Sequence, residues 1–404
     1  MVKVGIIGAG AAGIASALEA SKLGAQVCLL EANPKLGRKL SATGSGRCNI
    51  TNLQAKSEKY TCSESAVLKK ILMKYSPENL IAFLKEVGIP TYSTPDGWVY
   101  PISNSASNVA AILESRLKAQ GVKIHLQTLI TDIRESSEGF ILATADAKRS
   151  YQVQHVIAAT GSPAYPQLGA RNNLYSTFQR LGHTILPVLP ALTPIMTDPQ
   201  PFHKLQGVRL DAGVELLRNG RVMAATVGNI IFTRWGLNGP GVMDLSHLVS
   251  QNEGQTLTLR INIIPHYEST LTQMLSSAAD SNITIQAVLL AFLPAKAARF
   301  ILGKSGLPGG QTVQEITQNE KDCLLHTLKN VEVDVKGTRG FKHSQLSSGG
   351  IPLAEIHAGS LQSRIKPGLY FAGEVLDVLG PCGGYNLHWA FTSGLLAGRS
   401  AAIK

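Results

Sequence analysis

The chain has 404 residues, of which 44% are apolar and 16% charged, a composition typical of globular rather than disordered proteins. No apolar run approaches the roughly 18 residues that a bilayer span needs, so we predict no membrane segment. The net charge of +11 would suit nucleic acid. However, Lys and Arg are spread along the chain without a dense basic run, so nucleic acid is an unlikely partner and a phosphate-bearing cofactor fits better.

Five cysteines are scattered along the chain, at Cys28, Cys48, Cys62, Cys323 and Cys382. Their odd number and the lack of a C-x-x-C pair argue against structural zinc, dithiol exchange and iron–sulfur clusters. The sequence therefore predicts a protein of the reducing cytoplasm.

The N-terminal segment carries a dinucleotide-binding pattern. An apolar run at residues 4–7 is followed by Gly8, Gly10 and Gly13, which open a helix-like stretch over residues 14–23. Gly8 permits a tight turn, Gly10 lets the backbone approach a pyrophosphate, and Gly13 lets the helix lie close to the strand. The helix N-terminus then faces the phosphates. A secretory signal is rejected for this segment, since cleavage would remove the site.

A second apolar run at residues 27–30 ends in Glu31. An acid about 20 residues beyond the glycines binds the ribose hydroxyls and disfavours a 2′-phosphate, so NADP is not expected here. Strand, turn, helix, strand and acid together predict a Rossmann-type site at the start of the chain.

The next segments are a loop, helices and strands in turn. Residues 37–52 are polar and glycine-rich and are expected to form an extended loop. Residues 67–87 and 106–120 have helical apolar spacing. Runs at 122–126, 130–134 and 140–145 fit a small sheet over the nucleotide, and a strand over residues 153–160 enters a sharp turn at Ala159-Thr160-Gly161.

The middle of the chain changes character. The proline-rich residues 187–194 suggest a domain crossing. Short β-like segments over residues 195–264, with the hairpin signal Asn219-Gly220, predict an antiparallel barrel or sandwich. Residues 265–328 have helical patterning, and a strand at 331–335 is expected to return to the barrel.

The C-terminal part holds a second glycine-rich region. A buried strand over residues 368–374 ends in Gly373-Glu374, and Gly383-Gly384-Tyr385-Asn386-Leu387 leads into a helix over residues 389–403. A glycine-rich loop before a helix N-terminus can stabilise a phosphate or an anionic ring oxygen. The chain contains no second dinucleotide fingerprint, Walker loop or H-E-x-x-H motif, and His343 and His357 have no metal spacing. The pattern predicts one discontinuous dinucleotide fold with an insertion.

These motifs resemble the glutathione-reductase-like class of FAD-binding proteins. More narrowly, the segments at residues 44–52, 236–240 and 373–377, with Gly384-Tyr385-Asn386, resemble the BaiN/YhiN-like family of NAD(P)/FAD-dependent oxidoreductases, also called aminoacetone-oxidase-like flavoproteins. The resemblance covers the full length of the chain.

The resemblance implies an α/β fold, in which a Rossmann FAD-binding domain is interrupted by a β-barrel domain and a small helical domain. The expected boundaries are 1–190 and 345–404 for the FAD domain, 191–264 and 331–344 for the barrel, and 265–330 for the helical domain.

The resemblance also implies which residues hold FAD. Gly8 to Gly13 bind the pyrophosphate, Glu31 the adenosine ribose, and Gly373 and Glu374 the ribityl and pyrophosphate, while Asn386 and Leu387 offer amides to the flavin N1/O2 edge. Lys39 and Arg47 either add charge near the phosphate and ribityl oxygens or are solvated cations. Ile130 is a backbone contact to adenine or a core residue. The remaining expected cofactor residues are Ala11, Ala12, Ala32, Gly44, Gly46, Asn49, Ala159, Thr160, Gly161 and Gly384.

The implied activity is hydride transfer between flavin N5 and a small organic substrate bound between the flavin and the inserted domains, with NAD(P)H as a possible transient donor. The N-terminus of the helix expected over residues 389–403 would stabilise charge at N1 and O2 of the reduced flavin. Cys48 and His388 are weak catalytic candidates, with packing or structural hydrogen bonding as the alternative roles. A flavin-dependent RNA-modifying protein and a non-catalytic flavin-binding regulator are the competing functions. Substrate, electron donor and oligomeric state stay open.

Overall fold

The computed structural model describes residues 1–146, 149–171, 174–198, 200–277 and 282–403. The chain forms two compact units. One unit combines residues 1–189 with residues 345–404, and the other comprises residues 190–344. Each unit is described by itself.

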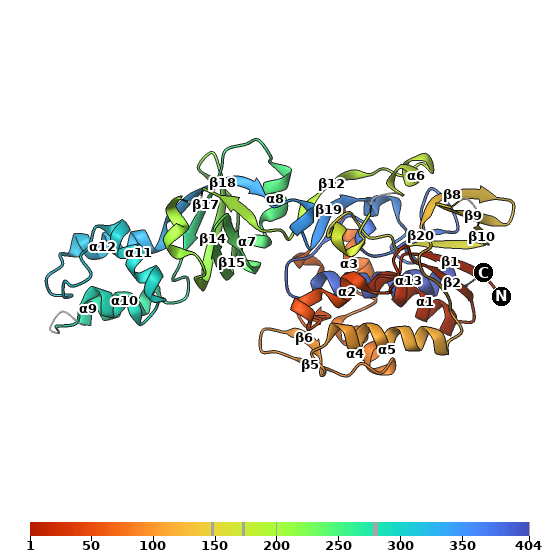
Figure 1. Cartoon of the computed structure of the whole chain (residues 1–404), viewed down its shortest axis with the longest axis horizontal. Coiled ribbons are helices and arrows are strands. Elements are labelled where there is room, and N and C mark those ends of the chain that lie inside the picture. Colours follow the sequence, from red (N-terminus) through yellow and green to blue (C-terminus); the bar gives the residue numbers. More distant parts are fainter. Residues whose placement is uncertain (147–148, 172–173, 199, 278–281, 404) are drawn as a thin grey trace. The chain divides into compact units, whose positions relative to one another are not determined.

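A parallel sheet forms the centre of the first unit, in the order β20-β11-β1-β2-β7. The bounds are Lys3–Ile7 for β1, Gln26–Leu30 for β2, Lys123–His125 for β7, His155–Ala158 for β11 and Leu369–Phe371 for β20. The strands are apolar because both faces are covered, as parallel sheets require. Segments from both ends of the chain therefore lie in one sheet (Figure 1).

Helices α1 (Ala11–Lys22) and α13 (Tyr385–Ala401) pack against each other beside this sheet. A Cβ on Gly394 would lie 2.3 Å from the Ala12 carbonyl oxygen, and a Cβ on Gly398 would lie 2.3 Å from that of Ser16. The Ser16 hydroxyl donates to the Gly394 carbonyl at 2.9 Å. Since Ala12 faces Gly394 and Ser16 faces Gly398, the two helices run parallel with small residues at the contact.

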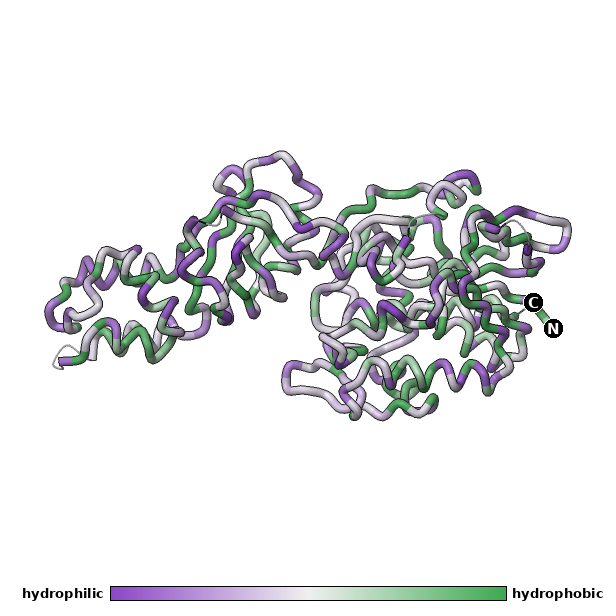
Figure 2. The backbone as a smooth tube through the Cα atoms, in the orientation of Figure 1, coloured by the Kyte–Doolittle hydropathy of each residue, from purple (hydrophilic) through white to green (hydrophobic). Residues whose placement is uncertain are grey.

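Further elements of the first unit surround the sheet (Figure 1). Small antiparallel sheets have the orders β10-β9-β8, β3-β6-β5, β12-β19 and β21-β4. Figure 2 shows hydrophobic residues along the central strands and helices of this unit. The bounds are α2 Arg38–Ser41, β3 Thr51–Asn52, β4 Thr61–Cys62, α3 Ser65–Leu72, α4 Pro77–Glu86, β5 Thr91–Ser93, β6 Trp98–Pro101, α5 Ala106–Ala119, β8 Ile130–Ser136, β9 Gly139–Thr144, β10 Ser150–Val153, α6 Tyr175–Arg180, β12 Leu186–Ala191, β19 Leu346–Gly350 and β21 Val378–Leu379.

Three expectations for this unit need correction. Residues 67–87 form two helices, because Ser76 and Asn79 make a capping box and Pro77 starts α4. The run at 122–126 contains β7, which extends the parallel sheet instead of joining the small β8–β10 sheet. The segment 37–52 is not entirely extended, since it contains the short helix α2, whose Leu40 side chain is buried.

The second unit contains a closed barrel of six strands in the order β13-β16-β15-β14-β17-β18. The bounds are β13 Ile195–Thr197, β14 Arg209–Arg218, β15 Arg221–Thr233, β16 Gly236–Asn238, β17 Leu257–Asn262 and β18 Val331–Thr338. The predicted Asn219-Gly220 hairpin joins β14 to β15, with φ of 51° and 76° at the two turn residues. Positive φ at both positions is the geometry of the type I′ turn that such dipeptides favour.

Helices complete the second unit. They are α7 (Pro240–Met243), α8 (Ser246–Gln251), α9 (Glu268–Ser277), α10 (Ile285–Leu290), α11 (Ala295–Ser305) and α12 (Gln318–Lys329). Their apolar faces and the barrel interior form one buried cluster. Among the helices of both units, judged over the described residues, none is long and apolar enough to cross a membrane.

Candidate functional site

Gly8 and Gly10 lie in the loop between β1 and α1, and Gly13 lies in the first turn of α1. A Cβ on Gly8, where φ is 98°, would lie 2.3 Å from the Ala159 carbonyl oxygen, and a Cβ on Gly13 would lie 1.8 Å from that of Gly8. These two glycines are required by backbone packing. Gly10 has φ of −75° and no heavy atom within 4 Å of the Cβ position. Gly10 therefore leaves open space at the start of α1.

The N-terminus of α1 is available to an anion. No side chain caps it within the described residues, and its first turn holds no acidic residue. The first amides of a helix and its dipole attract negative charge. Open space at Gly10 and an uncapped helix end together form the geometry of a phosphate site.

Glu31 lies at the end of β2, is 8% exposed, and is held by two neighbouring residues. The Ala9 amide donates to its Oε2 at 2.7 Å. The Asn33 amide and side-chain nitrogen donate to its Oε1 at 2.8 and 2.7 Å. The acid is thus fixed beside the glycine loop. Asn33 was not predicted from the sequence.

The turn at residues 159–161 lies on the other side of the loop. The Ala159 amide donates to the Ile7 carbonyl at 2.9 Å. Gly161 has φ of 69° and open space at its Cβ position. A Cβ on Gly373 would lie 2.8 Å from that of Ala12, so the end of β20 also contacts the start of α1. The structure therefore brings together the first glycine loop, Ala159 to Gly161 and Gly373.

A polar cluster surrounds Glu374. Lys39 Nζ donates to its Oε2 at 2.5 Å, and the Ser162 hydroxyl and Ser347 amide donate to its Oε1 at 2.5 and 3.0 Å. Two predicted residues, Lys39 and Glu374, thus form a half-buried ion pair. Ser162 and Ser347 were not predicted, since only the tertiary fold brings them to the acid.

Tyr175 adds an unsatisfied group to this region. Its hydroxyl is buried and has no hydrogen-bond partner among the described residues. Burial raises the pKa of Tyr175 above its usual value, and the negative charge of Glu374 raises it further. Because leaving a buried hydroxyl unpaired is costly, this atom is a place where a bound polar group would fit.

The parallel packing of α1 and α13 sets the spacing of their N-termini. Since Ala12 lies opposite Gly394, the first residue of α1 lies opposite residue 393, eight residues after α13 begins. At about 1.5 Å per residue, α13 begins about 12 Å beyond α1 in the same direction. In the part of the chain that the structure describes, no side chain caps either helix start. Two positive helix ends therefore point the same way, one behind the other.

The turn before α13 is held tightly. A Cβ on Gly384, where φ is 96°, would lie 2.4 Å from the Thr51 carbonyl oxygen and 2.7 Å from the Asn49 side-chain amide. The Asn386 side chain accepts from the Gly380 amide and donates to the Gly380 carbonyl, both at 2.8 Å. Asn49 and Gly384 are thus brought together, and Asn386 fixes the loop in front of the helix.

The two weak catalytic candidates are fully buried. Cys48 is 0% exposed, and burial raises the pKa of its thiol to about 11 against a smaller opposing effect of Thr43. His388 is also 0% exposed, and its Nδ1 lies 2.9 Å from the Thr51 hydroxyl. Burial lowers the pKa of His388 to about 4, against smaller opposing effects of the Tyr75 carbonyl and Glu78. At neutral pH Cys48 is a thiol and His388 a neutral ring.

Three further predicted residues lie within the segment 44–47, and Ile130 lies in the core. Arg47 is exposed, with its guanidinium 4.4 Å from the centre of the Tyr100 ring. Gly44 adjoins the same ring, and Gly46 has open space at its Cβ position. Ile130 is 2% exposed on β8.

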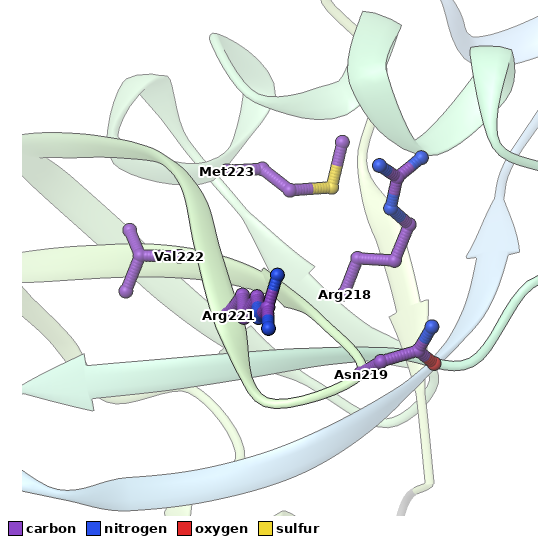
Figure 3. Close-up of a pocket in the computed structure, with 5 residues that line it drawn as sticks. All are labelled: Arg218, Asn219, Arg221, Val222 and Met223. Atoms are coloured by element: carbon purple, nitrogen blue, oxygen red, sulfur yellow. The ribbon is translucent and has the colours of Figure 1, made fainter.

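A cavity of about 670 Å³ lies in the second unit, at the β14–β15 hairpin. Its lining residues are Arg218, Asn219, Arg221, Val222 and Met223 (Figure 3). None of the predicted site residues lines it. It opens to solvent, and the Arg218 guanidinium already donates a hydrogen bond to Asn252 at 3.1 Å.

The glycine loop, the buried acid at the end of β2 and the parallel sheet define a Rossmann-type dinucleotide-binding protein. The chain belongs to a family: residues 2–400 match the HI0933-like protein Rossmann domain. The predicted family and the predicted FAD-dependent oxidoreductase activity are confirmed by this match and by the full-length relatives.

Two relatives align over nearly the whole chain. A 3-dehydro-bile acid delta(4,6)-reductase of Clostridium scindens is 34% identical over 411 residues, covering all of both chains. A ribosomal RNA dihydrouridine synthase of Escherichia coli is 28% identical, covering 96% of this chain and 95% of the relative.

Among solved structures, a 3-ketosteroid-Δ4-(5α)-dehydrogenase of Rhodococcus jostii has the same fold. The TM-score is 0.54 at 15% identity, and the match covers all of this chain and 97% of the other. This likeness supports the Rossmann-type FAD-binding α/β fold.

Proposed function

We propose that FAD binds in the first unit along the line from Glu31 to the start of α13. Glu31 binds the adenosine ribose, and the amides at the start of α1, at Ala11 and Ala12, bind the diphosphate. The open space at Gly10 and the orphaned Tyr175 hydroxyl support this fit. The neighbouring turn of Ala159, Thr160 and Gly161 closes over the diphosphate, and Ala32 and Ile130 flank the adenosine.

The second half of the cofactor follows the parallel helices. The cluster of Glu374, Lys39 and Ser162 lies at Gly373, between the two helix starts, and binds ribityl hydroxyls. The amides of Asn386 and Leu387 face the pyrimidine edge of the flavin. The offset of about 12 Å between the helix starts supports this order, since it separates the proposed position of the diphosphate from that of the ring.

The bound flavin supplies hydride transfer at N5. The start of α13 has the charge to stabilise the negative charge that reduction leaves at N1 and O2. Because Cys48 and His388 are buried and uncharged, we give both structural roles: Cys48 packs, and His388 binds Thr51 beneath the turn. The domain division suggested by the sequence is retained, with the barrel and the helices as insertions.

The reaction we propose is the reduction of a carbon–carbon double bond conjugated to a carbonyl group in a small organic substrate. A hydride is added to the β carbon and a proton to the α carbon. The observation that carries this proposal is the full-length 34% identity to a relative named as a Δ4,6-reductase of a 3-oxo compound. The dihydrouridine synthase name describes the same kind of bond, in a uracil ring.

Anaerobic reoxidation of the flavin tests this reaction. The holoenzyme is photoreduced and mixed with 3-oxo-Δ4 and 3-oxo-Δ4,6 steroids, and the return of the oxidised flavin spectrum is followed with product mass. We expect reoxidation together with a product heavier by two hydrogens. A flavin that stays reduced with every conjugated enone and dienone excludes the proposal.

The electron donor is tested separately. We propose that NAD(P)H visits the open flavin face, because the sequence contains a single dinucleotide fingerprint. Anaerobic bleaching by NADH or NADPH without saturation at low concentration is expected. A tight, saturable complex before bleaching contradicts a transient visit.

A second candidate is reduction of uridine in RNA, favoured by the name of the Escherichia coli relative and by the net charge of +11. It predicts tight RNA binding that weakens steeply with salt. A gel shift with ribosomal RNA fragments at two ionic strengths, with dihydrouridine analysis of the product, separates it from the small-molecule reaction. The five free cysteines favour a reducing, cytoplasmic location in either case.

A further inference from the structure

Three aromatic residues form a ladder on one face of the β3-β6-β5 sheet. Tyr92 on β5 pairs with Tyr100 on β6, and Trp98 on β6 pairs with Asn52 on β3. Paired residues, and residues two apart on one strand, share a face of the sheet. The Tyr92 and Tyr100 rings are stacked with centroids 6.0 Å apart, and those of Trp98 and Tyr100 are 6.4 Å apart.

One end of this ladder touches the turn before α13. The Asn52 side chain donates to the Gly383 carbonyl at 3.1 Å. A Cβ on Gly383, where φ is 113°, would lie 3.2 Å from Trp98 Nε1. Trp98 therefore lies against the turn where we place the flavin, and Tyr92 lies two rings farther out.

Arg47 lies over the outer part of the ladder. Its guanidinium is 4.4 Å from the centre of the Tyr100 ring, and its Nη2 donates to the Tyr92 hydroxyl at 3.2 Å. Nε and Nη2 also donate to Asn104 Oδ1 at 3.2 and 3.1 Å. Neutral groups thus hold the guanidinium over the Tyr100 ring. Within the described chain, Arg47 forms no ion pair with a carboxylate.

The chain segment that contains Arg47 and β3 is rich in positive charge. Residues 35–74, which contain Arg47 and β3, hold nine Lys and Arg against two Glu, a net charge of +7 out of +11 for the whole chain. Such a field concentrates anions and steers them toward the surface. An exposed guanidinium with free N–H groups suits a carboxylate or phosphate.

We propose that Arg47, Tyr92 and Trp98 form the recognition surface for an acidic substrate of the proposed flavin reaction. A flat conjugated carbonyl compound packs on the rings with its reactive end toward Gly383. Its carboxylate or phosphate, at the opposite end of the skeleton, binds Arg47. The inference rests on the proposed function, because that function places the flavin at the start of α13.

A charge-matched pair of ligands tests the role of Arg47. The ligands are a 3-oxo-Δ4 steroid acid and its methyl ester, which differ in the charged group. Variants R47Q and R47K are compared with K118Q, which removes one exposed charge of α5 that pairs with Glu114. Binding to the oxidised holoenzyme is followed by the change in flavin absorbance, and turnover by reoxidation of the reduced flavin.

We expect R47Q to bind the acid at least about tenfold more weakly, because one charge-assisted hydrogen bond is lost. Its affinity for the ester should stay within twofold of that of the unmodified enzyme. R47K retains part of the affinity, and K118Q leaves it unchanged. Equal weakening for acid and ester, or none, overturns the recognition surface. If neither ligand reoxidises the flavin, the reductase proposal fails, while the binding titration still decides the role of Arg47.

Discussion

Replacing Gly10 by Ala separates cofactor binding from folding. Gly10 has φ of −75°, which any residue adopts, and no heavy atom within 4 Å of its Cβ position. The added methyl group therefore strains nothing in the protein itself. It does occupy the open space in front of the α1 amides, where we place the diphosphate.

The expected effects differ in size. Ala at this N-cap position costs less than about 1 kcal/mol of folding free energy, so the apoprotein melts close to the unmodified one. Loss of one charge-assisted hydrogen bond to the diphosphate costs about 1.5–3 kcal/mol. We therefore expect G10A to bind FAD about 10- to 100-fold more weakly.

The assay combines apoprotein melting with FAD titration by fluorescence quenching. G303A is the matched control, because Gly303 in α11 also has open space at its Cβ position. It should leave FAD affinity unchanged and stabilise α11 by roughly 0.5–1 kcal/mol. G13A should impair folding itself, because its Cβ would lie 1.8 Å from the Gly8 carbonyl oxygen. We expect a lower melting temperature for this variant even without FAD. Unchanged FAD affinity in G10A would refute the placement of the diphosphate.

Three further predictions concern stability and reactivity. G394A should destabilise the protein by about 1–3 kcal/mol, because its Cβ would lie 2.3 Å from the Ala12 carbonyl; unchanged urea unfolding would contradict the close helix packing. The pKa of His388, about 4 in the folded protein, lies below its ordinary 6.5, so the unfolded chain binds more protons between these values. The free energy of unfolding should therefore fall by up to about 3 kcal/mol as the pH drops from 6.5 to 4. In urea unfolding at several pH values, H388N should lose this part of the pH dependence. If H388N shows the same pH dependence as the unmodified protein, another group causes it. Cys323, which is exposed, should react with a thiol reagent in the native protein, and Cys48 only after unfolding; fast native labelling of Cys48 would contradict its burial.

The Rossmann part of the fold was predictable because its signals are local. The glycine spacing, the apolar strands and Glu31 lie within one short segment, and the requirement for Gly8 and Gly13 follows from backbone geometry. The helix break at Pro77 was also encoded locally, through Ser76 and Asn79, but the apolar periodicity of the flanking helices hid it.

The polar surroundings of the site were not predictable, since they depend on long-range contacts. Ser162 donates to Glu374 across 212 residues of sequence. The Tyr175 hydroxyl is buried without a hydrogen-bond partner among the described residues, which only the tertiary structure can show. The aromatic ladder of Tyr92, Trp98 and Tyr100 is likewise a product of sheet register, since two tyrosines and a tryptophan in short strands carry no motif.

The parallel contact between α1 and α13 has a consequence for biosynthesis. α1 emerges from the ribosome hundreds of residues before α13, and until then its small-residue face at Ala12 and Ser16 has no partner. The proposed FAD site, which needs both helix starts, is thus completed late in translation. A nascent chain stalled before α13 should remain colourless, whereas the released chain can acquire its flavin.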